Sequence, residues 1–363
     1  MAIEKINIDR FLLLSKQYPM FDVRSPQEYN HAHIPTANNL PLFTNEERAV
    51  VGTAYKQESR EKAIKLGLNF FGPKMNSLLE DVEKNLLVQT ATTSPNEKII
   101  LIYCWRGGMR SAAVAWLLDL YGYKIFTLAG GYKKFRNYVL DTFKLEFNFQ
   151  ILGGYTGSGK TELLQELEKT GNAIIDLEKI ANHKGSSFGN IGMPDQPTQE
   201  MFENLLAKSL IEFAAQPSSK IWLEDESQRI GLINIPNDIW NRMRKSPVCF
   251  LEIAFEERLK HIVEEYGCLD KQKMIAAIER IQQRLGGLET KNAIAHLTND
   301  NTAACFQILL TYYDKWYAKG LQNRKEITSQ LSNVPCATVT PLNAEEVIRI
   351  SKNLEHKTNT VSF

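Results

Sequence analysis

One cysteine of this sequence stands where it would be reactive. Cys104 follows an apolar run at 99–102 and precedes Arg106, two glycines, Arg110 and a second apolar run at 112–118. The first run predicts a buried parallel strand and the second predicts a helix, so Cys104 lies in a loop at the carboxyl end of a strand. Backbone N–H groups and the helix dipole favour negative charge there. We expect a reactive Cys104 thiolate, in a loop that Arg110 closes and Arg106 assists, rather than an inert buried cysteine.

A second group of residues has the spacing of a phosphate-binding loop. Residues 154–161 read Gly-Tyr-Thr-Gly-Ser-Gly-Lys-Thr, between an expected strand and an expected helix. The glycines let the backbone approach phosphate oxygens, Lys160 supplies a positive charge, and the Thr161 hydroxyl can bind Mg²⁺. The residues expected to bind phosphate or diphosphate are Gly154, Gly157, Ser158, Gly159, Lys160 and Thr161.

Acidic residues follow two further expected strands. Asp176 ends the run at 173–175, and Glu224, Asp225 and Glu226 end the run at 220–223. An acid at such a position can hold a metal ion or position a water molecule, as in the second motif of nucleoside triphosphatases. Asp176, Glu224 and Glu226 are the candidates, and the spacing does not choose among them.

Three other features leave alternatives open. Arg258, Arg280 and Arg284 lie in a helical region, either as a lid over phosphates or as surface charges. The aromatic residues of 312–317 indicate either core packing or a platform on which a base or lipid stacks. A helical insert at 50–81 presents either a solvated face or an RNA-facing patch. Its segment 52–67 carries Lys56, Arg60, Lys62 and Lys65.

Alternating strands and helices must position both loops. We expect an α/β domain at 1–139, and at 140–363 a phosphate-binding-loop domain with strands at 148–152, 173–176, 220–226 and 248–253. After residue 255 the second domain is expected to be mostly helical. This alternation predicts parallel sheets with helices on both faces. A length of 363 residues is enough for two such domains.

The composition is that of a soluble globular protein, with 43% hydrophobic and 23% charged residues. A net charge of +1 provides no overall basic field, so any nucleic-acid binding must come from local patches. The five cysteines are widely spaced and include no Cys-x-x-Cys pair, which argues against a disulfide framework and a zinc site. With no targeting or membrane-spanning signal, we expect a cytoplasmic enzyme, monomeric and without a tightly bound cofactor.

The first domain resembles rhodanese-type sulfurtransferase domains. The resemblance is carried by Asp-Val-Arg at 22–24, Glu28-Tyr29, His-Ile-Pro at 33–35, the Cys104 loop and Leu-Ala-Gly-Gly-Tyr at 128–132. Ala32 and Thr36 depart from it, since the family usually has glycine there. The loop from Cys104 to Arg110 is one residue longer than in ordinary rhodaneses. In this it resembles rhodanese-related phosphatases, whose loop accepts a tetrahedral phosphate-like group.

The whole chain resembles the bacterial tRNA 2-selenouridine synthases, in both loops and in segments such as 52–57, 182–186, 224–227 and 284–287. The resemblance implies a transferase that acts on the wobble uridine of tRNA and converts a 5-substituted 2-thiouridine to 2-selenouridine through an S-geranyl intermediate. It implies selenophosphate as selenium donor. From the residues we expect the Cys104 thiolate to attack selenium, expel phosphate and carry a selanyl group. We hypothesise that residues 154–161 bind the diphosphate of geranyl diphosphate with the help of Mg²⁺, and ATP or GTP is the alternative ligand.

Two other functions remain as alternatives. The motifs alone also suit an ATP-dependent tRNA sulfurtransferase that uses a Cys104 persulfide. A non-catalytic module that binds tRNA or nucleotide and senses redox state through Cys104 is the second alternative. A complete anion-binding loop around Cys104 argues against the second, because a sensor has no use for it.

Overall fold

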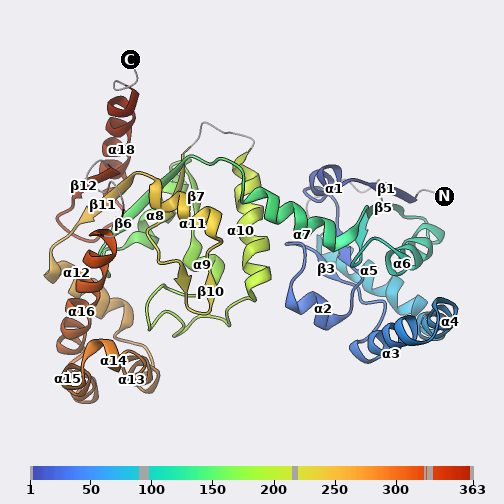
Figure 1. Cartoon of the computed structure of the whole chain (residues 1–363), viewed down its shortest axis with the longest axis horizontal. Coiled ribbons are helices and arrows are strands. Elements are labelled where there is room, and N and C mark those ends of the chain that lie inside the picture. Colours follow the sequence, from blue (N-terminus) through green and yellow to red (C-terminus); the bar gives the residue numbers. More distant parts are fainter. Residues whose placement is uncertain (1–2, 90–97, 215–219, 323, 325–329, 360–363) are drawn as a thin grey trace. The chain divides into compact units, whose positions relative to one another are not determined.

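Two compact units, Met1–Thr142 and Phe143–Phe363, make up the computed structural model (Figure 1). The structure describes residues 3–89, 98–214, 220–322, 324 and 330–359. The boundary falls at the end of helix α7 (Gly131–Thr142), close to the division between 139 and 140 that the sequence analysis expects.

The first unit is built on a parallel sheet of five strands in the order β1-β5-β4-β2-β3. Strand β4 (Ile99–Tyr103) lies at its centre and is buried along its whole length, as its apolar run predicts. Asp22 of β2 pairs with Tyr103 of β4, so the carboxyl ends of these strands lie side by side. The other strands are β1 (Ile3–Ile6), β2 (Met20–Asp22), β3 (Asn38–Asn39) and β5 (Lys124–Leu128).

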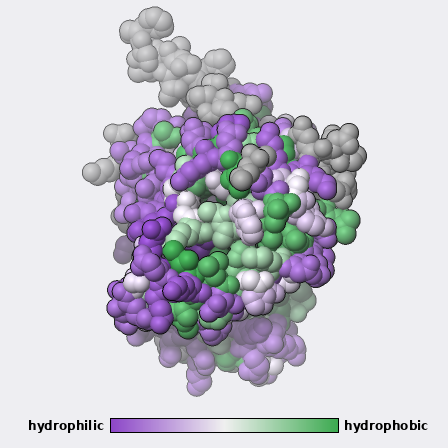
Figure 2. All heavy atoms as spheres, turned by 90° about the vertical axis from the view of Figure 1, so that its right-hand side faces the viewer, coloured by the Kyte–Doolittle hydropathy of each residue, from purple (hydrophilic) through white to green (hydrophobic). Residues whose placement is uncertain are grey.

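Helices and a helical insert cover this sheet. Leu78 and Val82 of α5 (Met75–Gln89) pack with Ile100 and Ile102 of β4 and with Val114 of α6 (Met109–Leu120) in one hydrophobic core. Figure 2 shows one face of this unit, where hydrophobic surface is exposed among hydrophilic residues. The helices are α1 (Ile8–Leu14), α2 (Pro26–His31), α3 (Asn45–Gln57), α4 (Arg60–Phe71), the 3₁₀ turn Gly72–Lys74, α5 (Met75–Gln89), α6 (Met109–Leu120) and α7.

A second parallel sheet of five strands, in the order β12-β11-β6-β8-β7, forms the second unit. The four expected strands are present as β6 (Phe149–Gly154), β7 (Ala173–Ile175), β8 (Ile221–Glu224) and β11 (Val248–Glu252). The expectation of a mostly helical region after residue 255 misses β12 (Leu331–Pro335), which pairs with β11 at the edge of the sheet. A hairpin of β9 (Arg229–Ile230) and β10 (Ile233–Asn234) completes the strands described.

The helices of the second unit fall into two groups. One flanks the sheet: α8 (Lys160–Lys169), α9 (Leu177–Ala181), α10 (Gln199–Ala214), α11 (Asn237–Lys245) and α18 (Asn343–Asn359). The other has its own hydrophobic core: α12 (Phe255–Tyr266), α13 (Lys271–Arg280), α14 (Gln282–Leu285), α15 (Gly287–Thr298) and α16 (Thr302–Gln322). Among the described residues, we find no helix with the length and apolarity needed to traverse a bilayer.

Candidate functional site

The Cys104 sulfur lies at the carboxyl end of β4 and at the start of α6, where the sequence places it. The Gly108 amide donates a hydrogen bond to Sγ at 3.3 Å, and the Ser111 hydroxyl lies 3.2 Å from Sγ. Burial opposes ionisation of the thiol, but these bonds, the Ser111 amide and the charge of Arg110 bring the pKa of Cys104 below its ordinary value. Cys104 is therefore a buried sulfur, 3% exposed, that its loop favours as a thiolate.

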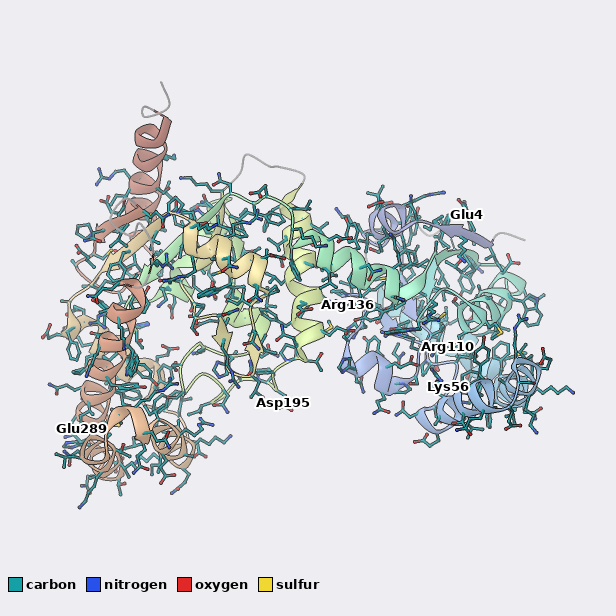
Figure 3. The ribbon with its side chains drawn as sticks, viewed as in Figure 1. Glu4, Lys56, Arg110, Arg136, Asp195 and Glu289 are labelled. Carbon is teal, nitrogen blue, oxygen red and sulfur yellow. The ribbon has the colours of Figure 1, made fainter. Side chains whose placement is uncertain are left out.

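Arg110, which is labelled in Figure 3, closes the loop and also pairs with a carboxylate of helix α2. Its Nη1 donates to Glu28 Oε2 at 2.6 Å, and its Nη2 donates to Oε1 at 3.3 Å. Arg48 approaches the same carboxylate, with 3.6 Å between its Nε and Oε2. Burial opposes ionisation of Glu28, yet the two arginines hold the pKa of its carboxyl below the usual range. Arg106, the other predicted arginine, is exposed.

The Gly-Gly segment at the start of α7 closes on the Cys104 loop from outside. The Tyr132 amide donates to the Cys104 carbonyl at 2.8 Å, and the Lys133 amide donates to the Trp105 carbonyl at 3.0 Å. Gly131 has φ of 58°, and a Cβ there would lie 2.2 Å from the Cys104 oxygen. Only glycine fits this approach, so the segment at 128–132 fixes the shape of the loop.

A buried ion pair supports the same edge of the sheet. The Arg24 Nη2 donates to Asp22 Oδ2 at 2.6 Å and to the Ala32 carbonyl at 2.7 Å. The guanidinium also lies 3.9 Å from the Tyr132 ring centroid. Arg24 is 1% exposed and Asp22 is fully buried. These contacts make the pair a structural support of the loop-bearing edge of the sheet.

The phosphate-binding loop runs from the end of β6 to the start of α8. The Lys160 Nζ donates to the Gly154 carbonyl at 3.1 Å across the loop. Gly157 has φ of 81°, and a Cβ there would lie 2.7 Å from an Ile262 carbon and 2.9 Å from the Arg258 carbonyl. Gly159, at φ of 70°, caps α8, and the buried Ser158 hydroxyl has no hydrogen-bond partner among the described residues. The loop thus has the conformation that its glycines predict.

Helices α12 and α16 hold this loop from the other side. The Arg258 Nη1 donates to the Thr156 carbonyl at 3.0 Å and to Asp314 Oδ1 at 2.9 Å. The Tyr317 hydroxyl receives the Gly154 amide at 3.2 Å and donates to Asp225 Oδ2 at 2.7 Å. Neither of the two roles considered for Arg258 applies, since it is a buried side chain that positions the loop.

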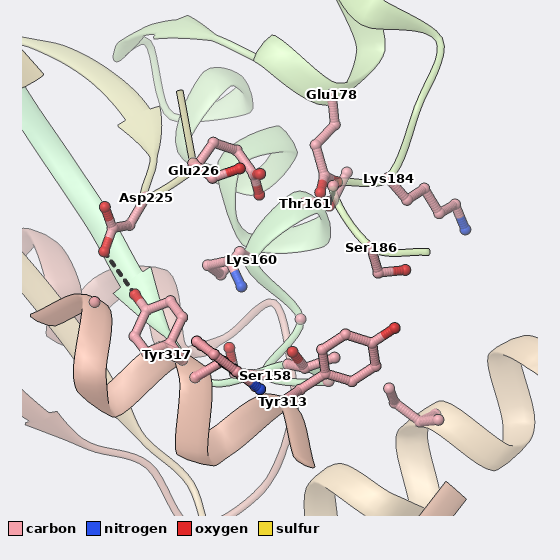
Figure 4. A pocket seen from close by; sticks show the side chains of 18 of the residues that line it. Ser158, Lys160, Thr161, Glu178, Lys184, Ser186, Asp225, Glu226, Tyr313 and Tyr317 are labelled. Carbon is pink, nitrogen blue, oxygen red and sulfur yellow. Dashed lines mark hydrogen bonds between the residues drawn. The ribbon is translucent and has the colours of Figure 1, made fainter. Parts of the chain in front are cut away.

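A pocket of about 410 Å³ opens beside the loop (Figure 4). Lys160 and Thr161 lie on one side of it, and Tyr313 and Tyr317 of α16 lie on the other. Tyr312, Trp316 and Arg284 also line it, with 5.8 Å between the Arg284 guanidinium and the Trp316 ring. The aromatic residues of 312–317 are therefore wall residues of a pocket.

The predicted acids occupy different places around this pocket. Glu226 lines it together with Glu178, whereas Asp176 caps α9 by accepting from the Lys179 amide at 2.7 Å. Glu224 is buried and accepts from the Glu178 amide at 2.9 Å. Burial and the neighbouring carboxylates raise the pKa values of Glu224 and Glu226 well above their ordinary value. Asp225, the fourth acid considered, pairs with Arg324 and Tyr317.

The residues beside Thr161 suit a magnesium ion. The Thr161 hydroxyl lies 3.3 Å from Glu178 Oε2, and Glu226 lines the same pocket. Hydroxyl and carboxylate oxygens are the ligands Mg²⁺ takes, usually with only one or two carboxylates and with phosphate oxygens of the substrate. Within the described ranges, no cluster of three or more His, Cys, Asp or Glu side chains could hold a metal ion.

Three residues that contact the predicted site residues were not themselves predicted to belong to a site. Ser111 touches the Cys104 sulfur, Glu28 binds Arg110, and Glu178 faces Thr161. Ser111 directly follows Arg110 in the loop, and that adjacency could have identified it. Glu28 and Glu178 lie on other elements, α2 and α9, and only the fold brings them to the loops.

Two family models match the chain, one for each unit. Residues 9–138 match the rhodanese-like domain, and residues 147–334 match the domain described as "tRNA 2-selenouridine synthase AAA domain". These matches agree with the expected fold class, a rhodanese-like domain followed by a phosphate-binding-loop domain of parallel-sheet type with a helical C-terminal part.

Curated proteins with the same name match most of the chain. The tRNA 2-selenouridine synthase of Hydrogenovibrio crunogenus is 36% identical over 90% of this chain and 94% of its own length. That of Azotobacter vinelandii is 39% identical over 70% of this chain and 66% of its own. A solved structure, the N-terminal domain of a putative ATP/GTP binding protein from Clostridium difficile 630, is 38% identical. It covers 38% of this chain and 99% of that one, with a TM-score of 0.33.

Proposed function

The chain belongs to the tRNA 2-selenouridine synthase family, and we propose that it replaces the sulfur of a 5-substituted 2-thiouridine at the wobble position of tRNA with selenium. One observation carries this proposal: the match to the relative from Hydrogenovibrio crunogenus extends over 90% of the chain and so includes both loops. The geometry of each loop supports the part of the reaction that we assign to it.

The first step proposed is geranyl transfer to sulfur at the phosphate-binding loop. The thiocarbonyl sulfur attacks C1 of geranyl diphosphate, an S–C bond forms, the C–O bond breaks, and diphosphate leaves as the nucleoside loses its N3 proton. Lys160 and the amides of the loop stabilise the charge that develops on the diphosphate. Mg²⁺ held by Thr161 and by Glu178 or Glu226 would supply further charge neutralisation there.

The second step proposed takes selenium from selenophosphate at Cys104. The loop offers what a tetrahedral phosphate-like anion needs: an amide aimed at the sulfur, Arg110 at its mouth, and one residue more than an ordinary rhodanese loop. The C2–S bond to the geranylated sulfur then breaks as a C2–Se bond forms, and geranylthiol leaves. Geranylation turns a poor leaving group into a better one.

Electron balance argues against Cys104 as a carrier of selanyl selenium. Attack of the thiolate on selenium would leave the electron pair of the Se–P bond on phosphorus, which yields phosphite rather than phosphate. Attack on phosphorus forms an S–P bond and releases selenide, which is the nucleophile that C2 needs, and water then frees phosphate from Cys104. We therefore place the attack of the Cys104 thiolate at phosphorus, so that selenium is released as selenide with no change in its oxidation state.

Nucleoside mass spectrometry tests the proposal. The protein is mixed with tRNA that carries 5-methylaminomethyl-2-thiouridine, geranyl diphosphate, selenophosphate and Mg²⁺, and each component is omitted in turn. We expect S-geranylation without selenophosphate, and exchange of sulfur for selenium only when both substrates are present. Phosphorus NMR of the same mixture should detect phosphate, and phosphite would return the attack to selenium.

The same mixture identifies the main alternative. If the wobble nucleoside stays unchanged while ATP is hydrolysed in a tRNA-dependent manner, the protein is an ATP-dependent sulfurtransferase and Cys104 carries a persulfide. Binding of tRNA without turnover of any substrate would indicate a non-catalytic module.

A further inference from the structure

We propose that the pocket beside the phosphate-binding loop continues into an apolar channel that holds the hydrocarbon chain of the diphosphate substrate. Helices α12 and α16 form its walls, and their side chains set the length of chain that is accepted. This inference rests on the proposed function, because it assumes that the loop binds a prenyl diphosphate.

A second, smaller cavity of about 20 Å³ adjoins the pocket. Thr156 of the loop lines both cavities, and so do Ile262 and Tyr266 of α12 and Tyr313 of α16. These shared residues form the wall between the two cavities, so a chain whose diphosphate lies on Lys160 reaches the second cavity only past their side chains.

Hydrocarbon side chains and aromatic rings line the far side of that cavity. Phe306, Leu309 and Leu310 of α16 and Phe188 are each at most 4% exposed. Phe306 lies 5.9 Å from Phe188 and 5.7 Å from Tyr266 between ring centroids, so these rings pack against one another in the wall of the cavity. These residues belong to the core of the helical group, which makes the channel an opening into that core.

The chemistry of this lining favours an alkyl chain over a nucleobase. The edges of a base carry several donors and acceptors, and burying them without partners costs free energy. The polar residues that line the second cavity are Thr156, Ser186, Tyr266 and Tyr313, and the Tyr313 hydroxyl already bonds to Ser187. A prenyl chain has no polar group to satisfy, and its burial is favourable.

The volumes indicate where the chain ends. In this proposal the larger pocket, about 410 Å³, holds the diphosphate and most of the chain. The second cavity, about 20 Å³, has room only for a methyl-sized group at the end of the chain. Leu309 and Phe306 therefore meet the last isoprene unit, and their size should decide which chain fits.

Chain-length competition tests this assignment. Wild-type protein, Leu309→Phe, Phe306→Ala and the control Leu297→Phe are each given tRNA with dimethylallyl, geranyl and farnesyl diphosphates. We expect Leu309→Phe to shift the transfer ratio toward dimethylallyl by at least about tenfold, and Phe306→Ala to shift it toward farnesyl by a similar factor. Leu297 lies in the same hydrophobic core but lines neither cavity, so its variant should keep the wild-type ratio.

Controls separate failure of the channel from failure of the function. If the variants bind inorganic diphosphate like wild type and keep the wild-type ratio, the channel assignment is wrong. If wild-type protein transfers no prenyl group at all, the proposed function fails first. Should the variants not fold, wild-type protein still decides: unreactive geranyl thiolodiphosphate should bind at least about tenfold more tightly than inorganic diphosphate. Equal affinity would contradict the channel.

Discussion

The Cys104 loop and the phosphate-binding loop share one plan but differ in how much of each site is local. Each follows a buried parallel strand and opens a helix, β4 and α6 in one unit, β6 and α8 in the other. Around Cys104, the sulfur, Gly108 and Ser111 come from one short stretch. Around Lys160, Glu178 lies 18 residues onward and Tyr313 more than 150. The hydrogen bonds to the Cys104 sulfur therefore come from one local stretch, whereas the second loop becomes a pocket only through the helices packed against it.

The largest expected effect, and the strongest test of the difference between the two loops, comes from removing the Cys104 thiol. Cys104→Ser should lower the rate of selenation by about three orders of magnitude or more, because the nucleophile of that step is lost. Geranylation should stay intact, because we assign it to the phosphate-binding loop of the second unit. Nucleoside mass spectrometry measures both products. Cys268→Ser, at an exposed cysteine, is the matched control. Loss of both activities in folded Cys104→Ser would contradict a division of labour between the loops.

Lys160→Ala is the reciprocal change. It should lower geranylation by about a hundredfold or more, since a charge aimed at the leaving diphosphate is lost. Selenation of tRNA that is already geranylated should continue. Lys169→Ala, at an exposed position on the same helix, serves as control. Unchanged geranylation in the Lys160 variant would remove the diphosphate from this loop.

The ion pairs that support the two loops, Asp22–Arg24 and Asp314–Arg258, should contribute differently to the free energy of unfolding. Asp22→Asn leaves the Arg24 charge unpaired in the core and should lower the free energy of unfolding of the first unit by about 3 kcal/mol. Asp314→Asn should cost less, because Asp314 is 23% exposed and Arg258 keeps its bond to Thr156. Urea unfolding of the full chain measures both. A larger loss for Asp314→Asn would reverse this order.

The smallest expected effect is a shift in the pH at which the Cys104 thiol becomes reactive. Because hydrogen bonds hold the pKa of Cys104 below its ordinary value, its alkylation should rise at lower pH than that of an ordinary cysteine. Ser111→Ala removes one bond to the thiolate, so the midpoint should move to higher pH and the rate at neutral pH should fall by roughly tenfold. Peptide mass spectrometry after iodoacetamide treatment follows Cys104 alone. A Ser77→Ala profile should match wild type, whereas a Ser111→Ala profile that also does so would exclude this bond as a cause.

The sequence did not predict two edge strands of the sheets, β1 and β12. Strand β1 and strand β12 are short and mostly exposed or half-buried, with one buried residue each. An edge strand covered on one side carries little apolar signal, and its pairing depends on partners far along the chain. The central strands β4, β6 and β8 are buried throughout, and their apolar runs could be located directly.

By itself, the sequence determined the two loops, their strand and helix contexts, the division into two α/β units and the family resemblance. These features depend on contiguous residues, where glycine spacing and apolar runs act locally. The tertiary structure decided that Arg110 pairs with Glu28, that Arg258 supports a loop, and that an aromatic helix walls the pocket. Such contacts join elements distant in sequence, and the packing of helices and sheet edges, which no local pattern encodes, places them together.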